Sequence, residues 1–211
     1  MTVRRVLQAC GASFAAGLLI GAAAPGPEPL AVAGQTDWAP RAFKLFCHRM
    51  PQECLPGKGE PSFDATPARL HELEAVNRAV NRRIEAATDF DVYGVSEHWA
   101  LPATQGDCED YALLKRHILI EKGWPVGSVL LTVVRDRKGQ GHTVLTVRTG
   151  REDQILDNTV DELRTWAQTP YLYVWRQSEN DPKVWVGLWG VATDTGAGLE
   201  DCEGDVSCVM P

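Results

Sequence analysis

The sequence predicts an α+β domain in which N-terminal helices pack on an antiparallel sheet. Two segments with apolar residues every three or four positions occur before residue 123, and β-branched segments separated by Gly-containing turns follow from residue 126. Helices followed by strands in this order are typical of the α+β class. The chain has 211 residues, which is enough to bury one sizeable core, and no internal repeat or linker divides it.

The composition is that of an ordinary globular protein, with 44% apolar and 23% charged residues. The formal net charge is −7, and no basic cluster stands out in the sequence. A nucleic-acid-binding surface needs such a cluster, so no nucleic-acid partner is expected.

Residues 1–33 have the features of an export signal. Arg4 and Arg5 precede a mostly apolar run, and Ala31-Val32-Ala33 matches the A-x-A pattern of a signal-peptide cleavage site. An uncleaved membrane anchor is the alternative, but several glycines dilute the apolar run. No later run is long enough to span a bilayer. Residues 34–211 are therefore expected to form a single periplasmic domain without membrane insertion.

The first helix is expected over 66–87, because Thr favours the N-cap and Pro favours the first helical position. The second is expected over 107–122, where Gly123 suits a left-handed C-terminal cap. The segment 34–65 before the first helix is expected to be irregular. The segment 88–106 between the helices contains Gly, Pro and Asp and is expected to be a loop.

The second half of the chain has strand character. Residues 126–134 and 142–147 are rich in β-branched side chains and flank a polar, Gly-containing turn, which predicts a β-hairpin. The tail from Thr193 is rich in Gly and Asp and is expected to be poorly ordered. The remaining elements are expected to be a strand over 155–157, a short helix over 160–168, and strands over 171–176 and 184–189.

Five of the six cysteines lie beyond the expected signal, and an odd number in an exported protein indicates a free thiol. The spacing suggests the pairs Cys47–Cys54 and Cys202–Cys208, although sequence alone permits other pairings. With these two pairs formed, Cys108 is the thiol that is left. A buried structural cysteine is the alternative to a chemical role for it.

Cys108 lies in the first turn of the second helix, directly after Asp107 at the N-cap position. Free N–H groups and the positive end of the helix dipole stabilise a thiolate there, and the thiolate is the nucleophilic form. The neighbouring Glu109 and Asp110 oppose this negative charge. A protonated histidine or a bound cation therefore has to offset them.

His142 begins the second hairpin strand, and Asp157 ends the next strand. A helix and two adjacent strands can bring three side chains together, which predicts Cys108 as nucleophile, His142 as its base and Asp157 as the group that orients the imidazole. Each residue has an alternative: His142 as a surface histidine, and Asp157 as a turn residue before Asn158. A Cys/His metal site is disfavoured because the chain lacks C-x-x-C spacing.

The motifs GDCEDYA at 106–112, GHTVL at 141–145 and LDN at 156–158 together resemble the bacterial transglutaminase-like cysteine peptidases. HWALP at 98–102 and the Cys47…Cys54 pair are also similar to that family, and the resemblance spans roughly residues 38–180. It implies a papain-like, transglutaminase-like core with a Cys-His-Asp triad. It also implies thiol protease activity.

The resemblance further implies a calcium requirement, with Asp107 and Glu109 at the positions of the ligands and Asp110 as a further candidate. The alternative is that Asp107 only caps the helix and Glu109 only favours its N-terminus. The best-known members of the family cut a large surface adhesin and so release biofilm cells. An inner-membrane cyclic-dinucleotide receptor sequesters them, and Trp99 is either part of that binding surface or a packing residue.

The expected activity is therefore that of an endopeptidase acting on an exported protein. Two alternatives stay open. A thioester on Cys108 could pass to an amine, which would give transglutaminase activity, or the domain could be a non-enzymatic periplasmic binding domain that keeps the fold.

Overall fold

The computed structural model describes residues 31–36, 38–57 and 62–188. Its main feature is a seven-stranded sheet in the order β1-β9-β8-β4-β5-β6-β7, in which every neighbouring pair is antiparallel. The strands are β1 (Val32–Thr36), β4 (Val129–Arg135), β5 (Gly141–Val147), β6 (Gln154–Leu156), β7 (Arg164–Thr165), β8 (Leu172–Gln177) and β9 (Trp185–Leu188). The predicted α+β class with an antiparallel sheet is confirmed.

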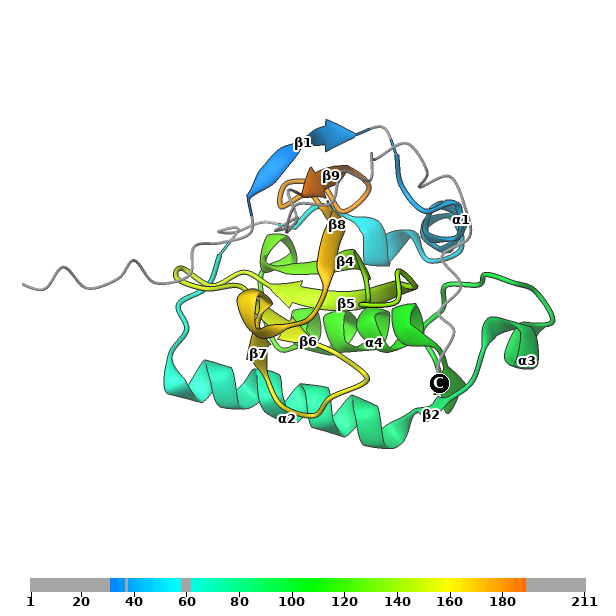
Figure 1. The fold of residues 1–211 in the computed structure, drawn as a ribbon, viewed down its shortest axis with the longest axis horizontal. Helices are drawn as coiled ribbons and strands as arrows, with labels where there is room; N and C mark the ends of the chain where they lie inside the picture. The colour runs from blue at the N-terminus through cyan, green and yellow to red at the C-terminus, as the bar shows by residue number, and fades with distance from the viewer. Residues whose placement is uncertain (1–30, 37, 58–61, 189–211) are drawn as a thin grey trace, which may run out of the picture.

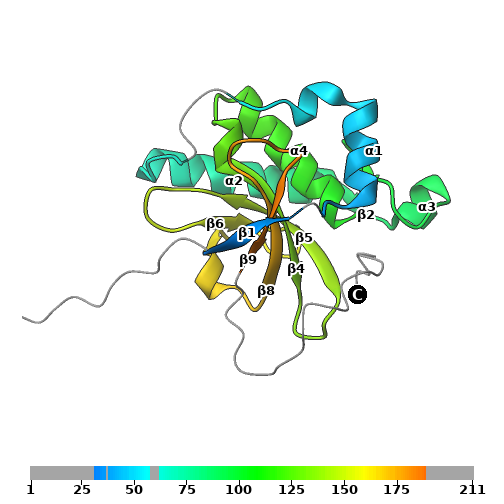
Figure 2. The ribbon, with the colours of Figure 1, turned by 90° about the horizontal axis from the view of Figure 1, so that it is seen from above.

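Helices cover one side of this sheet (Figure 2). The long helices α2 and α4 lie side by side, and α4 runs along β4 and β5 (Figure 1). A short parallel pair, β2 with β3, joins the segment after α2 to the start of α4. The remaining elements are α1 (Arg41–Arg49), α2 (Pro67–Arg83), β2 (Glu85–Ala86), α3 (Asp89–Tyr93), β3 (Gln105–Gly106) and α4 (Cys108–Glu121).

Both predicted helices form, but α2 ends at Arg83 and not at residue 87 as expected, because residues 85–86 form β2 and pair with β3. The Thr66 side chain accepts a hydrogen bond from the Arg69 N–H and so caps α2, with Pro67 at the first helical position. After α4, Gly123 has φ of 88°, a left-handed conformation that costs glycine little. The start of α2 and the end of α4 therefore follow the predicted capping signals.

The core fills the space between the helices and the sheet. Both long helices and the central strands contribute buried apolar side chains to it, among them Leu73, Val76, Leu113, Leu131 and Leu145. A smaller apolar cluster covers the other face of the sheet; it contains Val134, Val144, Ile155, Tyr173, Val186 and Leu188. Because both faces of the sheet are buried, β4 consists almost entirely of apolar residues and does not alternate between apolar and polar side chains.

Three further expectations for local structure are wrong. The segment 34–65 is not irregular, since it contains α1, whose Phe43 and Phe46 are buried against the core. The segment 88–106 contains the short helix α3 as well as β3. The helix expected over 160–168 does not form: β7 pairs with β6, and only a 3₁₀ turn over 166–168 follows. Strand pairing is a long-range interaction that overrides local helical spacing.

The disulfide Cys47–Cys54 is present, as predicted, and ties the end of α1 to the 3₁₀ turn after it. The expected Cys202–Cys208 pair and the tail from Thr193 lie outside the described residues, as does most of the expected signal. β1 begins at Val32, so cleavage after Ala33 would remove two residues of this strand. Among the described residues, no helix combines the length and the apolar character that crossing a membrane requires.

Candidate active site

The first turn of α4 lies against β5. Cys108 is the first residue of the helix and is almost completely buried, with 1% of its surface exposed. The backbone N–H of Thr143 donates a hydrogen bond to the Cys108 Sγ over 3.2 Å. The sulfur is therefore held beside the strand residue that directly follows His142.

The oxidation state of Cys108 differs from the sequence-based expectation. In this structure its sulfur is part of a disulfide bond, so the expectation that Cys108 is the unpaired thiol is wrong. A sulfur in a disulfide carries no proton and cannot act as the attacking thiolate. Any nucleophilic role for Cys108 therefore belongs to the reduced form of the protein.

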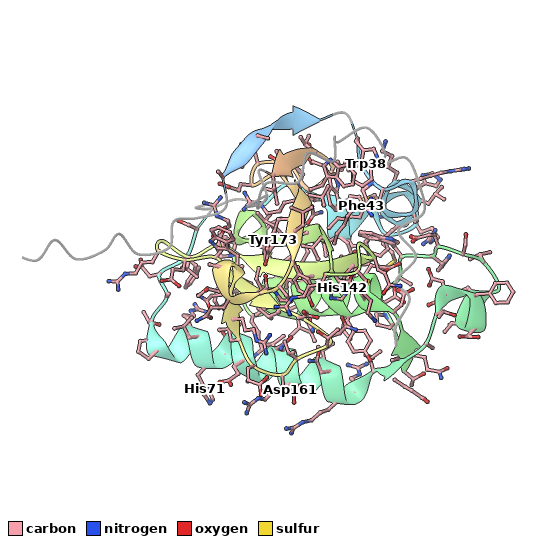
Figure 3. All side chains as sticks on the ribbon, viewed as in Figure 1. Trp38, Phe43, His71, His142, Asp161 and Tyr173 are labelled. Atoms are coloured by element: carbon pink, nitrogen blue, oxygen red, sulfur yellow. A yellow bond between two sulfur atoms is a disulfide. The ribbon has the colours of Figure 1, made fainter. Side chains whose placement is uncertain are left out.

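His142 and Asp157 form the hydrogen-bonded pair that the sequence predicts. His142 Nε2 lies 3.0 Å from Asp157 Oδ1, and both side chains are largely buried, with 12% and 3% exposed. β5 supplies His142, and the end of β6 supplies Asp157, so the pairing of these two adjacent strands sets the distance. Figure 3 shows His142 near the centre of the molecule, where β5 passes α4. Because Nε2 is engaged by Asp157, Nδ1 is the ring nitrogen left to face another group.

Three donors surround the Asp157 carboxylate. Besides His142, the Thr159 N–H donates to Oδ1 over 2.9 Å, and the Tyr171 hydroxyl donates to Oδ2 over 2.6 Å. Burial alone would raise the pKa of Asp157, but the hydrogen bonds from His142, Tyr171 and Thr159 and the charge of His142 hold it well below its usual value. Asp157 is therefore an anion throughout the neutral range and can stabilise an imidazolium.

Two asparagines of α2 fix the loop that follows Asp157. The Asn81 amide donates to the backbone oxygens of Asp157, over 3.0 Å, and Val160, over 3.1 Å. One turn earlier, the fully buried Asn77 donates to Val160 O over 2.8 Å. Asp161, at the end of this loop, lies beside α2 in Figure 3. The position of Asp157 thus depends on α2 as well as on the sheet.

A buried acidic group lies on the other side of Cys108. One carboxylate oxygen each from Asp89, Asp107 and Glu109 lies within 4.8 Å of the others, and all three residues are buried. Glu109 also approaches the nucleophile candidate, with its Oε2 3.3 Å from the Cys108 Sγ. The predicted pair Asp107 and Glu109 is therefore brought together, and Asp89 of α3 joins it as a third member that the sequence did not indicate.

The alternative role of Asp107 as a plain helix cap does not fit the structure. Asp107 occupies the N-cap position of α4, but its side chain makes no capping hydrogen bond. Its Oδ1 and the Oδ1 of Asp89 are buried and have no hydrogen-bond partner among the described residues. Buried carboxylate oxygens without donors fit a bound cation, because oxygen anions are the ligands of a hard divalent ion.

Burial and mutual repulsion raise the proton affinity of these carboxylates. Burial raises the pKa of Asp107 to about 6, and burial together with the charges of Asp107 and Glu97 raises the pKa of Glu109 well above its usual value. Such shifts mark a site in which like charges are held together at an energetic cost. A positive ion would remove that cost.

Asp110, the further candidate ligand, is placed differently. Its Oδ1 accepts a hydrogen bond from the backbone N–H of Ala100 over 2.7 Å, and burial raises its pKa to about 8. Gly106 allows this arrangement, because an added Cβ would lie only 2.6 Å from Asp110 Oδ2. Asp110 therefore anchors the 98–102 segment and is not a member of the close acidic group.

Trp99 is a packing residue. Its side chain is 2% exposed and its ring makes edge contacts with Phe43 of α1 and Trp185 of β9. The Arg49 guanidinium donates to its backbone oxygen over 2.7 Å. This burial excludes the Trp99 side chain from a surface that binds a receptor.

Comparison with known proteins identifies one matching family. Residues 33–192 match the family described as bacterial transglutaminase-like cysteine proteinase. No curated protein matches the chain.

Solved structures of a Legionella pneumophila protein, LapG, are similar to this chain. The calcium-bound form is 23% identical with a TM-score of 0.48, and the match covers 75% of this chain and 83% of that one. The EGTA-treated form is also 23% identical, with a TM-score of 0.47 and coverage of 72% and 77%.

Proposed function

Because the chain belongs to the bacterial transglutaminase-like cysteine proteinases, we propose that it is an exported endopeptidase whose reduced Cys108 is the nucleophile. In this proposal His142 is the base and Asp157 orients it. The observation that carries the proposal is that hydrogen bonds connect the segments that contain the three residues. The sulfur is hydrogen-bonded to Thr143 N–H, His142 is the adjacent residue, and its Nε2 is bound to a buried carboxylate.

Each step of the proposed reaction is assigned to a group of this site. His142 Nδ1 takes the thiol proton, and the Cys108 thiolate attacks the scissile carbonyl carbon. Backbone N–H groups at the start of α4 stabilise the oxyanion. His142 then donates its proton to the leaving amine, which departs and leaves a thioester. Water, deprotonated by His142, attacks the thioester and restores the thiol. Throughout, Asp157 fixes the tautomer of His142 and stabilises its charged form.

The disulfide at Cys108 sets a condition on this chemistry. Reduction has to release the sulfur before it can attack, so activity is expected only with a thiol reductant present. A preparation without reductant is expected to be inactive but folded.

Calcium is the proposed cofactor, and Asp89, Asp107 and Glu109 are the residues that would hold it. Bound there, the ion would supply positive charge that offsets the carboxylates beside Cys108. Three carboxylates are fewer than the six to eight oxygens that calcium takes. Backbone carbonyl groups and water would complete the shell.

The location and substrate are proposed from the resemblance of the sequence motifs. After removal of residues 1–33, the protein would act in the periplasm. Its substrate would be a large surface adhesin, and an inner-membrane receptor would regulate it. Because Trp99 is buried, the receptor surface would have to use other residues.

The central test is Cys108→Ala with fluorescently labelled casein as a general substrate, in the presence of calcium and reductant. We expect loss of detectable cleavage, with circular dichroism and Tm near those of the wild type. An active Cys108→Ala protein would overturn the assignment. If the protein incorporates a labelled amine into a glutamine donor and does not cleave peptides, its activity is that of a transglutaminase and not of a protease. If iodoacetamide labels reduced wild-type Cys108 no faster than a free thiol, the result would instead favour a binding domain.

A further inference from the structure

Tyr171 contacts both members of the His142–Asp157 pair. Its hydroxyl donates a 2.6 Å hydrogen bond to Asp157 Oδ2, and its ring centroid lies 5.4 Å from that of His142, with 55° between the ring planes. Tyr171 directly precedes β8, which is separated from β6 in the sheet by β4 and β5. The side chain therefore reaches the pair from a distant part of the sheet.

The two oxygens of Asp157 have separate partners. Oδ1 accepts from His142 Nε2 and from the Thr159 N–H, and Oδ2 accepts from Tyr171. Without the phenol, Oδ2 would lose this donor in a site where Asp157 is only 3% exposed. The carboxylate could then turn about its Cβ–Cγ bond to find another donor, and Oδ1 would move away from the imidazole.

We propose that Tyr171 is a positioning residue for the proposed protease reaction, which locks the Asp157 carboxylate in the orientation that serves His142. This inference rests on the proposed function. It assigns a task to a residue that no sequence motif indicated.

The phenol is suited to this task because it stays a donor. Burial and the negative charge of Asp157 raise the pKa of Tyr171 far above its usual value, so its proton is kept through the neutral and moderately alkaline range. The ring packed beside His142 also limits the space into which the imidazole can turn.

Tyr173 provides a matched control on the same segment. Tyr173 is 2% exposed, and among the described residues its hydroxyl makes hydrogen bonds with the Thr169 hydroxyl over 2.9 Å and with the Trp166 backbone oxygen over 3.5 Å rather than with Asp157. A general loss of packing or of one buried hydroxyl would appear in Tyr173→Phe as well as in Tyr171→Phe.

The test is a double-mutant cycle on thiol reactivity, which needs no peptide substrate. The second-order rate constant for alkylation of Cys108 by iodoacetamide is measured at neutral pH in reduced, full-length protein, and peptide mapping identifies the labelled cysteine. The variants are Tyr171→Phe, Asp157→Ala, their combination, and Tyr173→Phe. Circular dichroism and Tm are recorded for each variant.

We expect Tyr171→Phe to slow alkylation about tenfold, the factor associated with one lost hydrogen bond to a charged group. In the Asp157→Ala background the same change is expected to have less than about a twofold effect, because Tyr171 acts through Asp157. Tyr173→Phe is expected to stay within about twofold of the wild type.

Two results would overturn the inference while leaving the protease proposal intact: a wild-type rate in Tyr171→Phe, or an equal slowing with and without Asp157. A purely structural role for Tyr171 would give the second result. If wild-type Cys108 itself reacts no faster than a free thiol, the proposed function fails, and the positioning role fails with it.

Discussion

Lys115 is a buried charge that the structure keeps at a cost. It lies on α4 two turns after Cys108 and is 1% exposed, with its Nζ 5.8 Å from the centroid of the Tyr111 ring. Burial lowers the pKa of Lys115 from 10.5 to about 7, although the charges of Asp157 and Asp161 act in the opposite direction. Replacement by methionine keeps a chain of similar length and removes the charge.

The size of the expected effect follows from this pKa difference. Lysine in the unfolded chain binds a proton up to pH about 10.4, whereas Lys115 in the folded protein loses it near 7. The unfolded state therefore holds more protons between these values, and stability rises with pH across this window. Below pH about 7 the full cost is present, at most about 5 kcal/mol for a shift of this size. Lys115→Met is thus expected to stabilise the protein by several kcal/mol near pH 6, and the gain should shrink toward pH 10.

Urea unfolding at pH 6, 8 and 10 measures this effect, and Lys122→Met is the control. Lys122 is 45% exposed and pairs with Glu72 at 3.5 Å, so its replacement should change the free energy of unfolding by less than about 1 kcal/mol at every pH. A Lys115→Met protein that is less stable than the wild type at pH 6 would refute the reasoning. A gain in stability that does not depend on pH would refute it too.

Three further perturbations test the surroundings of Cys108. Addition of calcium to wild-type protein that has been dialysed against EGTA should raise its Tm, and this rise should be smaller in Asp89→Asn. A wild-type Tm that does not change on calcium addition would contradict the proposed site. Asn81→Ala removes the side chain that holds the loop after β6, so the free energy of unfolding in urea should fall by about 1–3 kcal/mol and casein cleavage should slow. Full activity of this variant would show that the loop does not need the Asn81 hydrogen bonds. Gly106→Ala forces a Cβ against Asp110 Oδ2 and should lower the free energy of unfolding in urea by at least about 1 kcal/mol. In the control Gly150→Ala, the added Cβ has its nearest neighbour at 3.9 Å, so the free energy of unfolding should change little. Equal effects of the two substitutions would show that the close approach of Gly106 to Asp110 is not a constraint.

The fold was predictable where local chemistry sets a boundary. Thr66 and Pro67 mark the start of α2, Gly123 marks the end of α4, and the β-branched segments around the Gly-containing turn form β4 and β5. α1 was missed although Phe43 and Phe46 have helical spacing, because a helix of nine residues gives only one such repeat. The segment 160–168 was misassigned because its conformation is set by pairing with β6 and by hydrogen bonds from α2, neither of which has a local signal.

The residues of the candidate site also divide into those that local sequence signals predicted and those that they did not. Cys108, His142 and Asp157 stood out because each lies at the end of a regular element, and the structure brings His142 to Asp157 and Thr143 to Cys108. Asp89 and Tyr171 did not stand out, because each is brought in from a separate segment by tertiary contacts alone. The disulfide at Cys108 was missed because sequence spacing does not show which distant cysteines meet in the fold.

The distance between Glu109 and Cys108 decides which charges can activate the thiol. Two negative charges 3.3 Å apart repel each other by about 5 kcal/mol at an effective dielectric constant of about 20. The dipole of α4 stabilises a negative charge by at most about 2 kcal/mol. The dipole alone therefore cannot sustain a thiolate beside an ionised Glu109. Protonation of Glu109, whose pKa burial raises well above its usual value, removes this repulsion. When Glu109 is ionised, the imidazolium of His142 and a cation held by Asp89, Asp107 and Glu109 would offset it in the proposed mechanism.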